Sequence, residues 1–119
     1  MLDPETMALL SRTNTVHITT TGRHSGRPRK IEIWMFEVEG RIVITGTPGP
    51  RAWLANLSAD PHLVIHLPNG TDVPAHATPV TDREFRRRVF TAEATWWYRS
   101  QTSVSDLVDN SPMVELDFR

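Results

Sequence analysis

The residues best suited to chemistry are concentrated in one short stretch, Gly22 to Lys30, between two segments that alternate like strands. It carries five cationic or potentially cationic side chains and a serine hydroxyl: Arg23, His24, Ser25, Arg27, Arg29 and Lys30. Glycines let a backbone turn sharply and approach a ligand closely, and its N–H groups can then surround an anion. Arginine adds bidentate hydrogen bonds to phosphate. We therefore expect this turn to bind a phosphate-bearing cofactor; the alternative is a solvated connection between strands.

No other group of residues has the spacing of a catalytic or metal site. His62, His66 and His76 could approach one another on paired strands, where histidines can bind metal, but the chain has no HExxH motif or Ser-His-Asp order. We expect no metal. If the cofactor predicted for the basic turn carries the chemistry, the protein supplies orientation and electrostatics, so we expect no essential acid–base side chain. Solvent or Tyr98 would provide any proton.

Four more arginines lie between Arg83 and Arg88. They form either the solvated face of a helix or a contact for nucleic acid. Single-stranded nucleic acid also requires exposed aromatic residues for base stacking, and a net charge of −1 gives no general attraction to polyanions. We expect a solvated helix face and no nucleic-acid partner.

Composition limits the class of protein. A chain of 119 residues is expected to form one domain, residues 1–119. The absence of cysteine excludes disulfides and thiolate metal sites. No apolar run approaches the roughly 20 residues of a membrane helix, and Met1 to Ser11 lacks the features of a signal peptide. We therefore expect a cytoplasmic protein with no integral membrane segment.

The basic turn must be held by strands, and alternating β-branched residues predict six of them. The expected strands are Asn14–Thr21, Arg29–Glu39, Arg41–Thr47, His62–Leu67, Asp72–Val80 and Ser111–Phe118. Asn69-Gly70 is a strong hairpin signal, while Pro74 and Pro79 suggest that their strand lies at a sheet edge. Six short antiparallel strands with such turns favour a small barrel.

Helices are expected in the connections. A short one opens at Asp3, which can cap its N-terminus, with Met7, Leu9 and Leu10 as its apolar face. A second runs from Arg51 to Ser58, and a third starts at Thr81 or Asp82 and runs to about Tyr98. Ser103–Val108 is expected to be a turn or short helix. The predicted fold is thus mainly β, a six-stranded antiparallel barrel with short flanking helices.

Three motifs together carry a resemblance to a known family. They are Thr21-Gly22-Arg23-His24-Ser25-Gly26, then Trp53-Leu54-Ala55-Asn56-Leu57, and then Asp60-Pro61 before an apolar strand. In this order they resemble the deazaflavin (F420)-dependent nitroreductases, split β-barrel oxidoreductases with an FMN-binding-like fold, related to pyridoxamine-phosphate oxidase. The resemblance covers about Val16 to Leu67 well and the C-terminal third weakly.

The resemblance implies coenzyme F420, or alternatively FMN or FAD, in a groove of the barrel, and hydride transfer to a small organic acceptor. The cofactor-binding residues implied are Arg23, Ser25, Arg27, Arg29, Lys30, Thr47, Gly49 and Arg51. Backbone groups near Thr47 and Gly49 would face the cofactor ring. The substrate-binding candidates are Trp34, Trp97 and Tyr98. Relatives of this barrel often form homodimers, so a homodimer is a possible assembly for this chain.

Each candidate has a structural alternative. Ser25 could simply form the turn, and Arg51 could be a helix-surface charge. Trp34 could pack in the core, while Trp97 and Tyr98 could anchor a helix end or contact a second subunit. Trp53 and Asn56 are expected to be structural, with Asn56 capping or tying a loop.

The chain departs from the family pattern in two places. The loop from Gly46 to Arg51 is shorter than usual, which leaves the identity of the cofactor open. The segment around Trp97 matches the aromatic segment of relatives only faintly, which leaves the substrate open. The rival interpretation is a non-catalytic split-barrel binder of flavin, haem or an apolar ligand.

Overall fold

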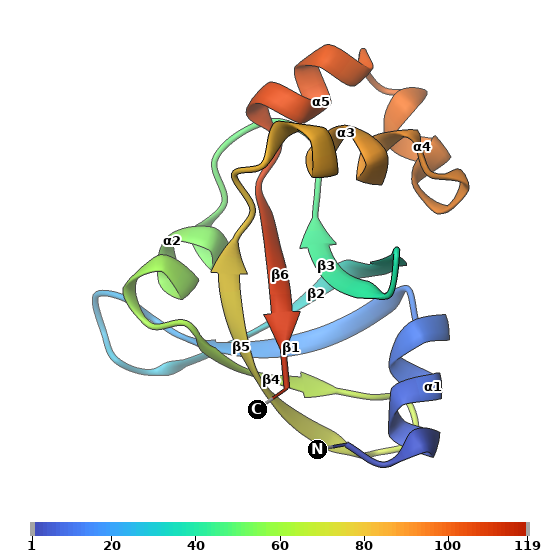
Figure 1. The fold of residues 1–119 in the computed structure, drawn as a ribbon. Helices are drawn as coiled ribbons and strands as arrows, with labels where there is room; N and C mark the ends of the chain where they lie inside the picture. The colour runs from blue at the N-terminus through green and yellow to red at the C-terminus, as the bar shows by residue number, and fades with distance from the viewer. Residues whose placement is uncertain (1, 119) are drawn as a thin grey trace.

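A six-stranded antiparallel barrel forms the centre of the molecule in the computed structural model, which describes residues 2–118 (Figure 1). Its strands are β1 (Thr15–Thr21), β2 (Pro28–Val38), β3 (Arg41–Thr45), β4 (His62–His66), β5 (Asp72–Pro79) and β6 (Met113–Asp117). They are ordered β1-β2-β3-β6-β5-β4, and β4 pairs with β1 to close the barrel. The predicted fold class is confirmed.

The edge position predicted for β5 is wrong, because this strand pairs with β4 on one side and with β6 on the other. Pro74 is opposite Val64 of β4 and has no partner in β6, whereas Pro79 is opposite Val114 of β6 and has no partner in β4. Each proline therefore lies where only one neighbour needs hydrogen bonds, so a closed barrel tolerates both.

Strand alternation divides the apolar side chains between two cores. Ile42 and Ile44 point into the barrel, while Val43 between them belongs to a second cluster outside it. Helices α1 (Pro4–Arg12) and α2 (Ala52–Ala59) pack on the inner core, to which Trp53 of α2 contributes. The outer cluster lies beneath α3 (Arg83–Thr91), α4 (Trp96–Arg99) and α5 (Val104–Asn110), which gather at one end of the barrel (Figure 1).

Two predicted helix starts are confirmed by their caps. The Oδ1 atom of Asp3 accepts the amide of Thr6 at 2.7 Å, and that of Asp82 accepts the amide of Glu84 at 3.0 Å. A carboxylate at this position satisfies an amide that the helix leaves unpaired. No helix within residues 2–118 is both long enough and apolar enough to cross a membrane.

The helix predicted to run to Tyr98 instead ends at Thr91, and a 3₁₀ turn (Glu93–Thr95) and α4 follow. Side chains from beyond the break bind the last carbonyls of α3: Thr95 Oγ1 donates to Val89 O at 2.5 Å, and Arg99 Nη1 donates to Phe90 O at 2.8 Å. These bonds replace the helical ones and turn the chain. As a result α4 lies beside β2 and brings its aromatic residues toward Trp34.

Candidate functional site

The basic turn between β1 and β2 is closed by its own hydrogen bonds. The amide of Gly22 donates to Arg27 O at 2.8 Å, and the hydroxyl oxygen of Ser25 accepts the amide of Arg27 at 3.1 Å. A Cβ atom on Gly22 would lie 2.8 Å from Ser25 Oγ and 3.2 Å from Arg27 O, so only glycine fits without a shift. Gly26 has a φ of 70°, which also favours glycine. Ser25 thus forms the turn, while its hydroxyl proton stays free to donate elsewhere.

Asn56 of α2 fastens this turn to the barrel. Its Oδ1 atom accepts the main-chain amide of Arg23 at 3.1 Å and Arg23 Nη1 at 2.9 Å, and its Nδ2 donates to Thr20 Oγ1 at 3.4 Å. The side chain is buried. Asn56 therefore ties the basic turn to α2, in agreement with the expectation that it ties a loop. It also orients Arg23, a cation of the predicted phosphate site.

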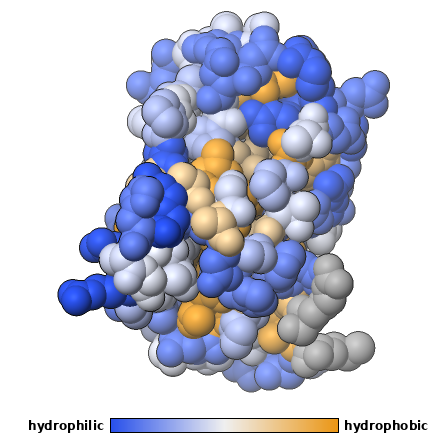
Figure 2. Space-filling view, turned by 90° about the vertical axis from the view of Figure 1, so that its left-hand side faces the viewer, coloured by the Kyte–Doolittle hydropathy of each residue, from blue (hydrophilic) through white to orange (hydrophobic). Residues whose placement is uncertain are grey.

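The turn and α2 enclose a cavity of about 310 Å³. Its polar and basic lining comes from Thr20, Arg23, His24, Ser25, Arg29 and Asn56. In the described part of the chain, none of its lining residues is acidic. A cleft lined by one sign of charge concentrates the field, so this cavity attracts anions. Figure 2 views the side of the molecule on which α2 and the turn lie, where hydrophilic residues project and apolar ones are visible between them.

A second cavity, of about 450 Å³, adjoins the first. Both have Ile31 and Trp53 in their lining, so we describe them as two ends of one groove. Trp34, Trp97 and Tyr98 form an aromatic wall in this second end. The Trp34 ring centroid lies 5.2 Å from that of Trp97 and 5.7 Å from that of Tyr98. Trp34 and Trp97 are 39% and 38% exposed, so they offer apolar surface to a ligand.

The loop from Gly46 to Arg51 lines the second end of the groove through Gly46, Thr47 and Arg51. Arg51 Nη2 donates to Thr47 O and to Thr47 Oγ1, both at 2.9 Å, so its guanidinium folds the loop while keeping a charge at the wall. Gly49 is not part of this lining. Its amide donates to Asn110 O at 3.1 Å and is therefore not available to a ligand in this conformation.

Two of the predicted phosphate ligands lie apart from the groove. Arg27 and Lys30 are exposed and do not line either of its ends. Because successive side chains of a strand point to opposite faces, Lys30 is turned away from the face that carries Arg29 and Ile31. The structure therefore brings together Arg23, Ser25 and Arg29 at one end of the groove and Thr47 and Arg51 at the other.

Tyr98 is the buried member of the aromatic wall, and its hydroxyl lies 3.5 Å from Thr45 O. Burial raises its pKa well above the ordinary value, and the charge of Arg51 offsets only part of that rise. The phenol therefore keeps its proton at neutral pH, so it can donate a hydrogen bond but is a poor proton donor in catalysis.

The histidines make separate local contacts. The rings of His62 and His76 meet edge to face at 5.5 Å, whereas His66 lies between Asp72 Oδ1 at 2.8 Å and Thr19 Oγ1 at 2.6 Å. Within residues 2–118 the structure contains no group of three or more side chains placed to hold a metal ion.

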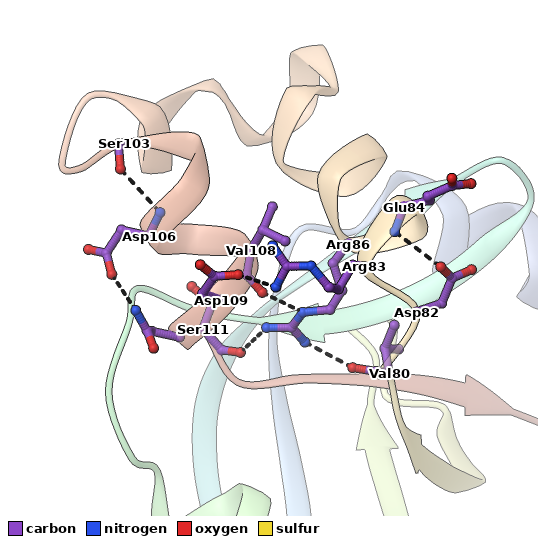
Figure 3. A network of polar contacts seen from close by, with 11 residues as sticks. Val80, Asp82, Arg83, Glu84, Arg86, Ser103, Asp106, Val108, Asp109 and Ser111 are labelled. Carbon is purple, nitrogen blue, oxygen red and sulfur yellow. Dashed lines mark hydrogen bonds and ion pairs between the residues drawn. The ribbon is translucent and has the colours of Figure 1, made fainter.

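The arginines of α3 are largely engaged within the protein. Arg83 pairs with Asp109, and Arg88 Nε donates to Glu39 Oε2 at 2.6 Å. Arg86 is buried and binds backbone carbonyls (Figure 3). The expectation of a solvated helix face is therefore wrong for Arg86. Its spacing of three and four residues from the buried Val89 and Phe90 is the signal that could have revealed this.

Comparison with solved structures shows the same fold in several proteins. A protein related to general stress protein 26, of the pyridoxinephosphate oxidase family, from Clostridium acetobutylicum superimposes with a TM-score of 0.71 at 13% identity, covering 96% of this chain and 81% of that chain. An FAD-binding protein from Mesorhizobium loti gives 0.65 at 12% identity, covering 100% and 91%. A chain solved as a domain-swapped dimer gives 0.62 at 20% identity, covering 90% and 81%.

At the level of sequence, a search of curated proteins gives no significant match. A family model, in contrast, matches residues 3–108, which include both ends of the groove. The model describes the F420H(2)-dependent quinone reductases. Because the match extends over most of the 119 residues, the chain belongs to the F420H(2)-dependent quinone reductase family.

Proposed function

We propose that this protein binds reduced F420 in the groove and transfers a hydride to a small organic acceptor of the quinone class. The observation that carries the proposal is the continuity of the groove. Its cationic end adjoins its aromatic end across Ile31 and Trp53, in a chain that belongs to an F420H(2)-dependent family. A cofactor that joins an anionic group to a planar ring could place the anion at the cationic end and the ring toward the aromatic end.

The residues at the cationic end fit a phosphate. Arg23 and Arg29 supply charged donors, and the Ser25 hydroxyl proton is free. Because Gly22 has no side chain, Ser25 Oγ and Arg29 Nε can both lie against the turn. Asn56 holds Arg23 in place. Arg27 and Lys30, which lie outside the groove, would remain near an acidic tail that extends into solvent.

At the other end, Trp34, Trp97 and Tyr98 would orient the acceptor and exclude water from it. The deazaflavin, when bound, supplies the hydride. Thr47 and Arg51 would border the ring, and the charge of Arg51 would stabilise negative charge that develops on the acceptor oxygen. The raised pKa of Tyr98 favours solvent as the source of the accompanying proton.

Cofactor titration tests this proposal directly. Purified protein is titrated with F420 and separately with FMN and FAD, following the quenching of tryptophan fluorescence. We expect F420 to bind with a Kd below about 100 μM, equivalent to a binding free energy of about −5.5 kcal/mol. Failure of all three to bind would contradict the cofactor site. Tight binding without turnover of quinones, nitroaromatics or enones would instead support a non-catalytic binder.

We also propose that the protein forms a homodimer. Support comes from a structural neighbour that was solved as a domain-swapped dimer. Light scattering at micromolar concentration tests this, and a mass of one chain would contradict it. The cytoplasmic location stays a prediction.

A further inference from the structure

Arg86 is a buried cation whose hydrogen bonds all go to main-chain carbonyls. Its side chain is 8% exposed. Nε donates to Val108 O at 2.7 Å, Nη1 to Val80 O at 2.9 Å and Nη2 to Ser111 O at 2.5 Å (Figure 3). A guanidinium presents donors in several fixed directions, so it can bind three carbonyls that diverge in the chain.

These carbonyls belong to the segments that surround the end of α5. Val108 and Ser111 stand on either side of Asn110, the last residue of α5, while Val80 follows β5. Carbonyls at a helix C-terminus lack partners within the helix and carry partial negative charge. The nearby carboxylate of Asp109 is engaged by Arg83 instead (Figure 3). Arg86 therefore donates hydrogen bonds to the main chain at both ends of residues 108–111.

The same segment supports the wall of the groove. Asn110 O, which lies between Val108 O and Ser111 O in the chain, accepts the amide of Gly49 at 3.1 Å. Pro112 O, which follows Ser111, accepts the hydroxyl of Thr45 at 2.6 Å. Thr45 lines the aromatic end of the groove, as do Gly46 and Thr47 in the loop that contains Gly49.

We propose that Arg86 is a positioning residue for this groove: by fixing residues 108–112 it holds the loop from Gly46 to Arg51 at the aromatic end. The proposal rests on the proposed function for what the groove binds, but the mechanical link from Arg86 to Gly49 is independent of any ligand. Arg86 itself is not part of the groove lining.

Two substitutions and one control separate this role from general stability. Arg86→Met keeps much of the volume and removes all donors, while Arg86→Lys keeps the charge and some donors. Val89→Ala is the matched control, because Val89 is fully buried on the same helix and contacts the outer cluster. It lowers stability without removing a hydrogen bond from residues 108–111.

The first measurement is amide hydrogen exchange by NMR. It is expressed as the exchange rate of the Gly49 amide divided by that of the Ile44 amide, which belongs to a buried residue of β3. We expect Arg86→Met to raise this ratio about tenfold or more, because local opening of the loop becomes easier while the barrel stays closed. Arg86→Lys should give a smaller rise and Val89→Ala no change. An unchanged ratio in both Arg86 variants would overturn the proposal. If Arg86→Met does not fold, the same ratio of exchange rates is compared between Arg86→Lys and Val89→Ala.

The second measurement is functional. In Arg86→Met we expect the KM for a quinone acceptor to rise about tenfold and the Kd for F420 to rise less, because the loop borders the acceptor and the cofactor ring, whereas the basic turn still holds the phosphate. Equal effects from Val89→Ala would show that only stability is involved and would contradict the role. If the wild type binds no F420, the proposed function fails, but the exchange ratio still tests the link to Gly49.

Discussion

The Oδ1 atom of Asn56 accepts two hydrogen bonds from Arg23, one from the main-chain amide at 3.1 Å and one from Nη1 at 2.9 Å. A single buried amide on α2 therefore sets both the backbone and the guanidinium of a residue 33 positions away in the chain. This arrangement reduces the freedom that Arg23 would lose on binding an anion, so the site is preorganised.

Replacement of Asn56 by alanine should affect both stability and binding. We expect the free energy of unfolding to fall by about 1–3 kcal/mol, because two partly buried donors of Arg23 lose their acceptor, and F420 affinity to fall about tenfold. Chemical denaturation and fluorescence titration measure the two effects. Ser58→Ala, an exposed change on the same helix, is the control. An unchanged Kd in Asn56→Ala would show that Arg23 does not depend on this contact for ligand binding.

Arg29 and Lys30 are adjacent in sequence but point to opposite faces of β2, and only Arg29 lines the groove. We expect Arg29→Ala to weaken F420 binding by about 1.5–3 kcal/mol, the usual effect of losing a charged hydrogen bond. Lys30→Ala should change affinity by less than about 0.5 kcal/mol and mainly alter its salt dependence. Titrations at low and high salt measure both. Equal losses would contradict the assignment of the phosphate to the groove.

Trp97 and Trp96 form a similar pair for the acceptor site. Trp97 lines the aromatic end, whereas Trp96 is 61% exposed and lies outside it. We expect Trp97→Ala to raise the KM for a quinone about tenfold, since aromatic contacts contribute about 0.5–1.5 kcal/mol beyond area burial. Trp96→Ala should leave steady-state kinetics unchanged. A larger effect from Trp96 would place the acceptor elsewhere on the surface.

Tyr98 is the single tyrosine of the chain, so tyrosinate absorbance reports on it alone. Because burial raises its pKa, the folded state holds the phenolic proton more tightly than the unfolded state. The resulting stabilisation is fully present below the unfolded pKa of about 10 and is lost as pH rises through the folded pKa.

In an alkaline titration we therefore expect no tyrosinate in the native protein near pH 10 and its appearance at higher pH, together with loss of the native circular dichroism signal. Unfolded protein in denaturant is the control and should titrate at about pH 10. Tyrosinate forming near that pH while the fold stays intact would show that Tyr98 is solvated.

Local patterns predict much of the fold. The alternation of apolar side chains predicts the six strands, and Asp3 and Asp82 predict the starts of two helices. The glycines and Ser25 predict the turn between β1 and β2. Long-range pairing is harder to predict, because two prolines in β5 suggest an edge, and only closure of the barrel shows that each has a neighbour on one side alone.

Composition and strand periodicity are local properties, so the residues alone show that cations gather in one turn and aromatic residues in another segment. Which of them share a groove is visible only in the folded chain: Arg29 lines the groove and Lys30 does not, and Tyr98 contacts Trp34, 64 positions away in the sequence. The burial of Arg86 and the contact of Asn56 with Arg23 likewise appear only in the fold. Burial and side-chain pairing depend on which segments pack together, and barrel closure brings together residues whose separation in sequence carries no signal of contact.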